Sequence, residues 1–550
     1  MSNFNPHPIP AIMYTMSCLK KFTKSFTVAQ MIMLLILIAW YIFFLAKKMD
    51  LVTADLGRHI ANGGIILHNG FSGAGHSVLY SNLYSYTDPN YSFLNHHSAS
   101  GVIFFLINQI AGFNGVSIYF IVVSIATFLI FFHIARRTAG FSLSFALALL
   151  FIPLIADRVE IRPEAFSYFF IAMFFYMLRQ WYEQKINPRW LYLLPVLTLL
   201  WVNIHIYFFF GFFLVAVFFL NEVIAFTKGT SPTAVRTRIK QLFIVIVLMV
   251  LAALCNPAGI KGLLYPLAIF KNYGYLIVEN QSIWFLERMG FMTSTFPLFK
   301  ISLGIVAASF VACIAKRRAA CSFINAAIAC TLTAISLLAI RNFALFGLFA
   351  LPITAEHIAA ILPAHIKHDM ETFYSGFVFL LSLFAIGVFA LAYPRIAQQY
   401  QMFGIGLAPS IPDAAMFFLD HHIQGPILNN YDIGGYLIYY LYPRERVFVD
   451  NRPEAYPDSF FTNIYIPLQQ NEDAWQAANA IYGFNAIFFS HRDYTPWAQA
   501  FLIARIKDPN WAPVFADQYA IIFLKRNAVN DSLIKEFEIP KNHFSVSATP

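Results

Sequence analysis

Long apolar runs separated by short polar connections constrain this chain more than any other feature of its sequence. A helix that crosses a bilayer needs about 20 mostly apolar residues, and runs of that kind recur between residues 27 and 393. Hydrophobic residues make up 59% of the 550 residues and charged residues 12%, against about 25% charged residues in a soluble globular chain. The pattern predicts a polytopic α-helical membrane protein with about 11 transmembrane helices.

The predicted spans cover residues 27–46, 115–134, 141–156, 163–181, 190–204, 207–226, 241–255, 298–315, 320–340, 342–362 and 373–393. The shorter run 98–112 has two interpretations, a further span or a helix in the membrane interface. The loop cations favour the interfacial helix, because Arg136 and Arg137 then lie in the cytoplasm and the later loops obey the positive-inside rule.

The net charge of +9 does not indicate nucleic-acid binding, because the cations flank the apolar runs. Lys20, Lys21 and Lys24 precede the first run and no small-residue cleavage site follows it, so we expect an uncleaved signal anchor with a cytoplasmic N-terminus. Eleven or so crossings then carry the C-terminal segment outside the cytoplasmic (inner) membrane. The five cysteines show no metal-ligand or redox spacing and imply no disulfide framework.

The polar segments divide the chain. Residues 1–393 are predicted to form a transmembrane domain with a first outer loop at 48–114 and a second at 256–297, where we expect re-entrant or interfacial helices. Residues 394–550 are predicted to form an extracytoplasmic α/β domain with a mostly parallel sheet. Its expected strands are 426–429, 446–450, 485–491, 512–517 and 519–524, and its expected helices are 411–422, 433–441, 472–482 and 496–506.

Ionisable residues collect at the outer ends of the predicted spans, where charge is expensive and therefore indicates a functional site. The set comprises Asp55, His59, His96, His97, Arg162, Glu164, His205 and Arg341. We assign Asp55 and His59 to catalysis and the other six residues to substrate binding, and we assign no metal ligands.

The first outer loop holds the candidate base. A helix capped by Thr53, with Asp50 as the competing cap, would place Asp55, His59 and Asn62 on one face. An aspartate in this place can act as general base on a hydroxyl, and His59 can orient it. The simpler alternative is an interfacial helix that Asp55 merely caps.

The other members of the set are also open to two interpretations. No cofactor is required, but a divalent metal held by Asp55, His59 and one of the pair His96/His97 stays an alternative to a solvated histidine pair. Arg158 or Arg162 suits a phosphate or pairs with neighbouring carboxylates. Arg341, in a very short outer turn, either binds an anion or extends its side chain to the interface.

Two stretches of the distal segment follow predicted strands, at 429–436 and 450–454. The first ends in Gly434-Gly435 before a helix, where an anion can bind, and the second lies where ligands sit in open α/β sheets. Ordinary turn chemistry is the alternative for both.

These motifs resemble bacterial members of the GT-C class of membrane glycosyltransferases, which includes protein O-mannosyltransferases and the lipid A aminoarabinose transferase. A poorly characterised GT-C-like group is similar along nearly the whole chain. The outer loop of that group has three patterns, each of which has a counterpart here. Asp-x-Gly-x-His-x-x-x-Gly corresponds to residues 55–63, Tyr-Ser-Tyr-Thr to residues 84–87, and Asn-His-Glu to residues 95–97. The elements at 162–164, 201–205, 256–257, 341–342 and 429–454 also fit. His97 is a departure, because a Glu is usual there.

The resemblance implies an inverting hexosyl or pentosyl transferase. Its donor would be a polyprenyl-phosphate sugar, its acceptor an envelope lipid, glycan or protein outside the membrane, and its base Asp55, with Arg162 and Arg341 near the lipid-phosphate leaving group. Two competing functions stay open. One is a transporter or flippase of lipid-linked sugars, which would favour repeated halves and broken helices. The other is a non-catalytic envelope scaffold.

Overall fold

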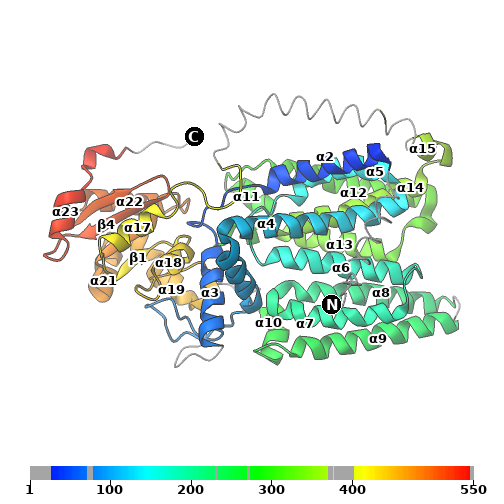
Figure 1. Ribbon diagram of the computed structural model, residues 1–550, viewed down its shortest axis with the longest axis horizontal. Coiled ribbons are helices and arrows are strands. Elements are labelled where there is room, and N and C mark those ends of the chain that lie inside the picture. Colours follow the sequence, from blue (N-terminus) through cyan, green and yellow to red (C-terminus); the bar gives the residue numbers. More distant parts are fainter. Residues whose placement is uncertain are drawn as a thin grey trace, which may run out of the picture. The chain divides into compact units, whose positions relative to one another are not determined.

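The structure is a computed structural model that describes residues 27–70, 78–229, 232–268, 273–369, 376 and 402–545. Six described helices are long and apolar enough to cross a membrane, and three shorter apolar helices accompany them. The expected class, a polytopic α-helical membrane protein with a C-terminal α/β part, is confirmed (Figure 1). The number of spans stays a prediction. Lys20, Lys21, Lys24 and nearly all of the predicted span 373–393 lie outside the described residues.

The chain forms two compact units, which are described one at a time. The first unit comprises Met1–Leu45, Ile125–Val159 and Glu279–Gln401, and the second comprises Ala46–Ser124, Glu160–Val278 and Met402–Pro550. The predicted domain limits at 393 and 394 remain predictions.

Helix α14 (Phe343–Ile361) is the centre of the first unit. It packs against α5 (Phe141–Ile155), α12 (Thr295–Arg317) and α13 (Phe323–Leu338), and α2 (Val28–Leu45) packs on α5. Nearly every side chain of α14 is buried, because helices surround it. The stacked rings of Phe299 and Phe343, whose centroids are 4.1 Å apart, join α12 to α14. Short helices of this unit are α11 (Ile283–Arg288), η4 (Arg318–Ala320), η5 (Ile340–Asn342) and α15 (Ala364–Asp369).

Helix α4 (Ser98–Ala139) is broken at Gly112, whose φ of 60° belongs to no α-helix. The predicted separation of 98–112 from the following span therefore has a physical cause. In the second unit, the part of α4 before Gly112 crosses α3 (Leu56–Asn69) very closely. A Cβ atom at Gly63 would lie 2.1 Å from the carbonyl oxygen of Gly101, so the crossing requires glycine.

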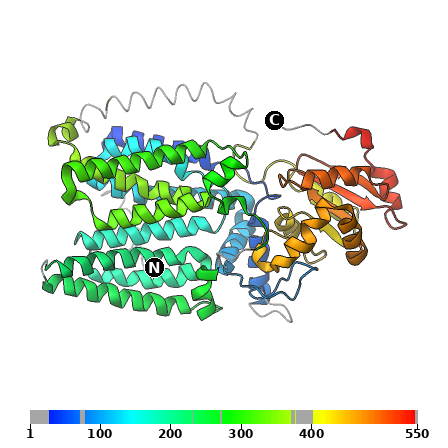
Figure 2. The ribbon, with the colours of Figure 1, turned by 180° about the vertical axis from the view of Figure 1, so that it is seen from behind.

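Four helices of the second unit lie side by side (Figures 1 and 2). They are α6 (Glu164–Tyr182), α7 (Leu193–Ile204), α8 (Phe209–Thr227) and α9 (Pro232–Leu254). Trp201 of α7 is fully buried and stacks on Phe170 of α6. Short helices accompany them, and these are η1 (Pro188–Tyr192), η2 (Ile206–Phe208) and α10 (Ile260–Ala268). The short helix η3 (Val278–Asn280) begins with the last residue of this segment and continues into the first unit. Re-entrant or interfacial helices were expected at 256–297, and the short helices α10, η3 and α11 lie there. Their position relative to the membrane stays a prediction.

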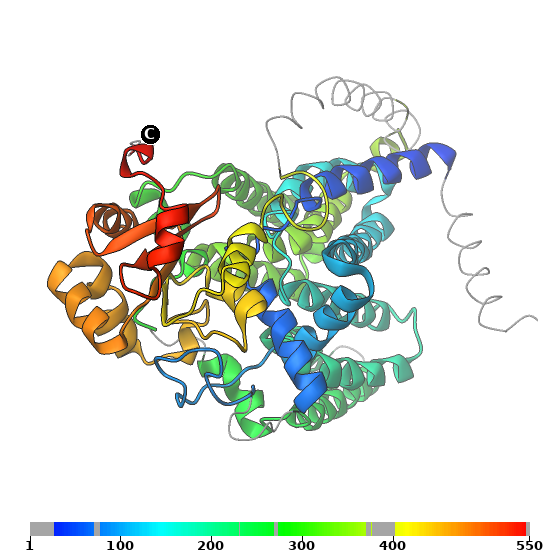
Figure 3. The same ribbon diagram turned by 60° about the vertical axis from the view of Figure 1, so that its left-hand side comes forward.

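The second unit also holds a four-stranded sheet of order β1-β2-β4-β3 (Figure 3). Its strands are β1 (Ile427–Asn429), β2 (Ala486–Ser490), β3 (Trp511–Ala516) and β4 (Ala520–Lys525). The longer helices of this part are α17 (Asp413–Asp420), α18 (Gly434–Leu441), α21 (Glu472–Tyr482), α22 (Ala498–Lys507) and α23 (Asp531–Phe537). Shorter helices are η7 (Pro453–Ala455), α19 (Asp458–Phe460), η8 (Phe461–Tyr465), α20 (Pro467–Gln470) and η9 (Lys541–His543).

Two expectations about this sheet are wrong. Only β1 and β2 pair in parallel, whereas β4 is antiparallel to both β2 and β3, because a three-residue connection between β3 and β4 forces a hairpin. The predicted strand 446–450 makes only an isolated bridge, between Val447 and Ser85. The Asn429 side chain accepts the N–H of Phe448 at 2.8 Å and donates to the carbonyl of Val449 at 2.7 Å, so a side chain occupies backbone groups that a strand would pair.

Candidate functional site

Asp55 occupies the N-cap position of α3, one residue before the helix begins at Leu56. Its side chain makes no capping hydrogen bond, so the alternative in which Asp55 caps the helix holds only for its position. The expected caps are wrong, since Thr53 precedes the helix by three residues and Asp50 accepts the N–H of Val52 at 3.0 Å instead. The carboxylate of Asp55 is therefore not used to start the helix.

Two arginines approach this carboxylate. Nη1 of Arg162 lies 3.8 Å from Oδ2 of Asp55, and Nη2 of Arg58 lies 4.0 Å from Oδ1. The Asp55 side chain is 20% exposed, while that of Arg58 is 5% exposed, so the carboxylate is reachable but its cationic neighbours are held by the protein. Arg58 donates from Nε to the Asn451 side chain at 3.2 Å, which fixes the guanidinium next to Asp55.

A second carboxyl group, Asp432, belongs to the same neighbourhood. Burial raises the pKa of Asp432 to about 7, and the carboxylates of Asp493, Asp55 and Glu160 add to the increase while Arg162 opposes it. Asp432 follows β1 and precedes α18. It is brought near α3 by a glycine contact, because a Cβ atom at Gly57 would lie 2.9 Å from the carbonyl oxygen of Gly435.

Four histidines form a cluster next to α3, and they come from three segments far apart in sequence. The ring of His97 lies 5.3 Å from that of His59, 3.9 Å from that of His96 and 5.1 Å from that of His205, measured between centroids. Burial lowers the pKa of His59 and of His97 well below its usual value, and the neighbouring cations and histidines act in the same direction. Both rings are therefore neutral at pH 7.

The hydrogen bonds of His205 define its tautomer. The indole N–H of Trp201 donates to the Ser167 hydroxyl at 2.8 Å, and that hydroxyl lies 2.7 Å from Nδ1 of His205. Nδ1 also accepts the N–H of Tyr207 at 3.4 Å. Since Nδ1 accepts, a neutral His205 carries its proton on Nε2.

An open pocket of about 380 Å³, including the solvent at its mouth, lies beside this cluster in the second unit. His96 lines it, and so do Asn95, Asn203, Asn256 and Tyr265, among apolar residues of the α7–α8 connection. The ring of Tyr265 lies 4.6 Å from that of His96. The pocket thus brings together three predicted elements, at 95–97, 201–205 and 256–257. A mostly apolar lining with a few polar groups is typical of ligand sites.

Arg341 belongs to the first unit, where it shares a carboxylate with Arg158. Nη1 of Arg341 lies 3.6 Å from Glu279, and Nη1 of Arg158 lies 2.8 Å from the same side chain. Arg341 also donates to the Asn280 side chain at 3.0 Å. The remaining predicted residue, Glu164, is buried in the first turn of α6.

The distal stretch 450–454 is structural. Arg452 is 2% exposed and Asp450 is fully buried, and Arg452 donates from Nε and Nη2 to the two carboxylate oxygens of Asp450 at 2.6 Å each. Asn82 accepts from Arg452 at 2.9 Å, and the hydroxyl of Tyr456 donates to Asp450 at 3.0 Å. This buried network occupies both carboxylate oxygens of Asp450, so turn and core chemistry explains the stretch.

The alternative metal site is not assembled. Among the residues that the structure describes, the ligand atoms of Asp55, His59, His96 and His97 do not form a compact group. The one group of three metal-ligating side chains that does is Cys313, Cys321 and His357. The sequence interpretation also missed Arg58 and Asp432. Arg58 follows Asp55 by three residues, a spacing that pairs charges on a helix, whereas no local signal connects Asp432 with the first loop.

No protein-family model matches the chain, and no curated protein matches it. Solved structures do match. The oligosaccharyltransferase of Archaeoglobus fulgidus, solved with Zn and sulfate, is 13% identical with a TM-score of 0.48, and the match covers 90% of this chain and 73% of that one. ArnT of Cupriavidus metallidurans, solved with undecaprenyl phosphate, is 12% identical with a TM-score of 0.49. That match covers 91% of this chain and 98% of the ArnT chain. Both are GT-C glycosyltransferases, the class that the sequence resembles.

Proposed function

We propose that this protein is an integral membrane glycosyltransferase that moves a sugar from a polyprenyl-phosphate donor to a hydroxyl of an extracytoplasmic lipid, glycan or protein. The observation that carries the proposal is the carboxylate of Asp55, which is accessible, is not used as a helix cap, and lies beside Arg58 and Arg162. A base for the acceptor and a cation for the leaving group are the two groups that such a transfer needs.

The chemistry follows from these groups. Asp55 accepts the proton of the acceptor hydroxyl while the oxygen attacks the anomeric carbon of the sugar. The bond from that carbon to the phosphate oxygen breaks, and the electron pair leaves with the polyprenyl phosphate. Attack opposite the leaving group inverts the anomeric carbon. Arg162, 3.8 Å from Asp55, is assigned to the negative charge that develops on the phosphate.

His59 and His97 suit positioning rather than proton transfer at pH 7, because a buried imidazole of low pKa does not take up a proton readily. We assign His96, which lines the pocket, and His205, whose ring lies beside that of His97, to substrate hydroxyl groups. His59 and His97 connect that pocket to α3 through ring contacts, so we assign them to positioning. Glu164 and Arg341 keep their proposed binding roles, Arg341 as a second candidate for the donor phosphate.

The test is a transfer assay with the full chain in nanodiscs and a panel of polyprenyl-phosphate sugars. We expect release of polyprenyl phosphate that depends on an added envelope extract as the acceptor source. Analysis of envelope glycans and lipid-linked sugars in a deletion strain would then identify the product. Movement of intact lipid-linked sugar across the bilayer, without release of the carrier, would instead support a flippase and overturn the proposal.

A further inference from the structure

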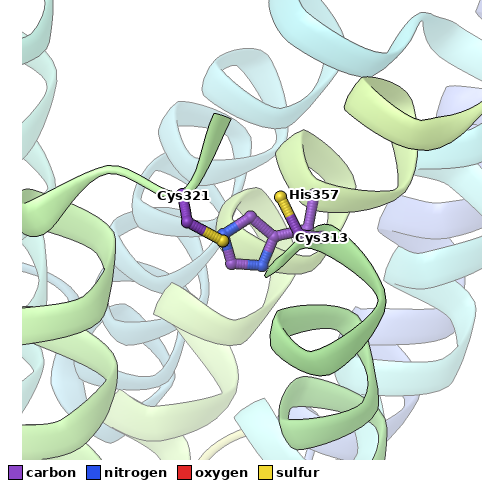
Figure 4. Close-up of side chains that lie close together, drawn as sticks. All are labelled: Cys313, Cys321 and His357. Carbon is purple, nitrogen blue, oxygen red and sulfur yellow. The ribbon is translucent and has the colours of Figure 1, made fainter. Parts of the chain in front are cut away.

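The first unit contains a second group of reactive side chains, none of which has a role assigned above. Cys313 lies near the end of α12, Cys321 follows the short helix η4, and His357 lies on α14. Their ligand atoms all lie within 4.8 Å of one another, and Figure 4 shows the three side chains gathered at one point. Cys313 and His357 are fully buried. We propose that these three residues bind one Zn²⁺ ion.

The hydrogen bonds of His357 prepare it as a ligand. The Ser309 hydroxyl donates its single proton to the carbonyl of Val306 at 2.7 Å, so toward Nδ1 of His357, 3.1 Å away, Ser309 acts as the acceptor. Nδ1 therefore carries the proton, and Nε2 keeps its lone pair. Among the described residues this buried Nε2 has no hydrogen-bond partner. A metal-binding histidine usually has this arrangement, with its other ring nitrogen donating to a fixed oxygen.

The donor set selects the ion. Two thiolates and one imidazole suit Zn²⁺, whose charge the thiolates balance, and three protein ligands leave one coordination position for water or another donor. Zn–S bonds of about 2.3 Å in a tetrahedral site hold two sulfur atoms about 3.8 Å apart. Ligand atoms already within 4.8 Å need only small side-chain rotations to reach that spacing, because the backbone has already brought them together.

The surroundings favour a metal over a disulfide. Lys316, Arg317 and Arg318 lie at this end of α12 and predict that it faces the cytoplasm, where thiols stay reduced. Ion binding here would fix the turn after α12 to α14, and this role is independent of the transferase proposal. The sequence did not reveal the site because the two cysteines lie eight positions apart, unlike the close Cys pairs of common zinc motifs.

The experiment uses the full chain, purified in detergent with a thiol reductant. We expect one Zn²⁺ per chain, and after chelation a Co²⁺ titration that gives thiolate-to-cobalt charge-transfer absorption. Cys313→Ser, Cys321→Ser and His357→Gln should each abolish that absorption. Ser309→Ala should weaken Co²⁺ binding by about 10- to 100-fold. Cys330→Ser, on α13 and exposed, is the matched control and should bind normally.

A second measurement works if these variants fail to fold. Zn²⁺ added to the chelated wild-type chain should protect Cys313 and Cys321, but not Cys330, from alkylation, read by peptide mass spectrometry. The proposal is overturned if the reduced wild-type chain binds neither Zn²⁺ nor Co²⁺, or if Zn²⁺ gives no such protection. It is equally overturned if alkylation of native membranes traps a Cys313–Cys321 disulfide, or if folded variants bind Co²⁺ as the wild type does.

Discussion

Arg162 lies between two carboxylates, with Nη1 at 3.8 Å from Asp55 and Nη2 at 2.7 Å from Glu160. The shorter contact holds the guanidinium, and the longer one leaves space next to Asp55. A cation fixed in advance stabilises developing charge without reorganising during the reaction. If Glu160 only holds Arg162, Glu160→Gln should reduce transfer much less than Arg162→Gln, measured as kcat/KM for the donor. Equal losses in the two variants would show that the carboxylate of Glu160 itself takes part.

A lysine substitution at Arg341 distinguishes two roles of this side chain, anion binding and simple extension to the interface. Lys reaches the interface as well as Arg does, but it lacks the planar fork that grips a phosphate. We predict that Arg341→Lys keeps expression and thermal stability and raises the KM for the donor about tenfold, the loss of one charge-assisted hydrogen bond. Arg158→Lys is the control, because Arg158 and Arg341 both contact the carboxylate of Glu279. A lysine variant with an unchanged donor KM would make Arg162 the better phosphate ligand.

Asp432 should make stability depend on pH. Its pKa is raised to about 7 in the folded protein, against about 3.9 in an unfolded chain. Between these values the folded state binds more protons, so the free energy of unfolding falls as pH rises. Asp432→Asn removes this dependence. Its thermal midpoint relative to the wild type should therefore rise between about pH 4 and pH 7 and stay level above. A difference that is constant across that range would contradict the raised pKa.

Alanine substitutions at two glycines of the first outer loop test the close crossing of α3 and α4. Gly63→Ala would place Cβ 2.1 Å from a backbone oxygen, whereas Gly64→Ala would meet only a ring carbon of Phe105 at 2.9 Å. We predict that Gly63→Ala lowers the yield of folded protein sharply, and that Gly64→Ala is tolerated after a small ring movement. Size-exclusion profiles of fluorescent fusions give the comparison, and similar profiles for the two variants would refute the crossing.

Arg452 should stabilise the folded protein through its buried ion pair with Asp450. Arg452→Met leaves Asp450 buried without its partner, which typically costs about 3–5 kcal/mol. The control is Arg492→Met. Arg492 is 37% exposed and lies 3.4 Å from Asp50, and such exposed pairs contribute about 0–1 kcal/mol. Thermal or denaturant unfolding of the two variants in detergent decides the point. Comparable small losses would reopen a ligand-binding role for Arg452.

Much of the fold was predictable because hydrophobic length and period act locally. The helices at 141–155, 164–182 and 209–227 match expected spans, and four of the five strands expected in 394–550 formed. The fifth failed because the Asn429 side chain, 17 or more residues away, took its backbone groups. The expectation of a mostly parallel sheet was also wrong, since strand direction depends on the connections, and the short connection between β3 and β4 requires an antiparallel pair.

The site was predictable only in part. Asp55 stood out because an acid at a membrane boundary is rare, and the glycines beside it now have a cause in the contacts of Gly57 and Gly63 with other backbones. Asp432 did not stand out, because its raised pKa depends on carboxylates from three other segments. The cysteine–histidine group was missed for the same reason. It exists only after α12 and α14 pack together.

Asp55→Asn is the most direct test of the proposed transferase. Asparagine keeps the shape of the side chain but cannot accept the acceptor's proton, and loss of a general base typically lowers the rate by about a hundredfold to ten-thousandfold. We predict that the variant inserts and folds normally, binds the donor, and loses transfer to that extent, while Asp50→Asn, in the same segment, stays near wild type. The decisive measurement is single-turnover release of polyprenyl phosphate in nanodiscs with acceptor present. Release by Asp55→Asn at the wild-type rate would remove Asp55 from the mechanism and contradict the proposed base.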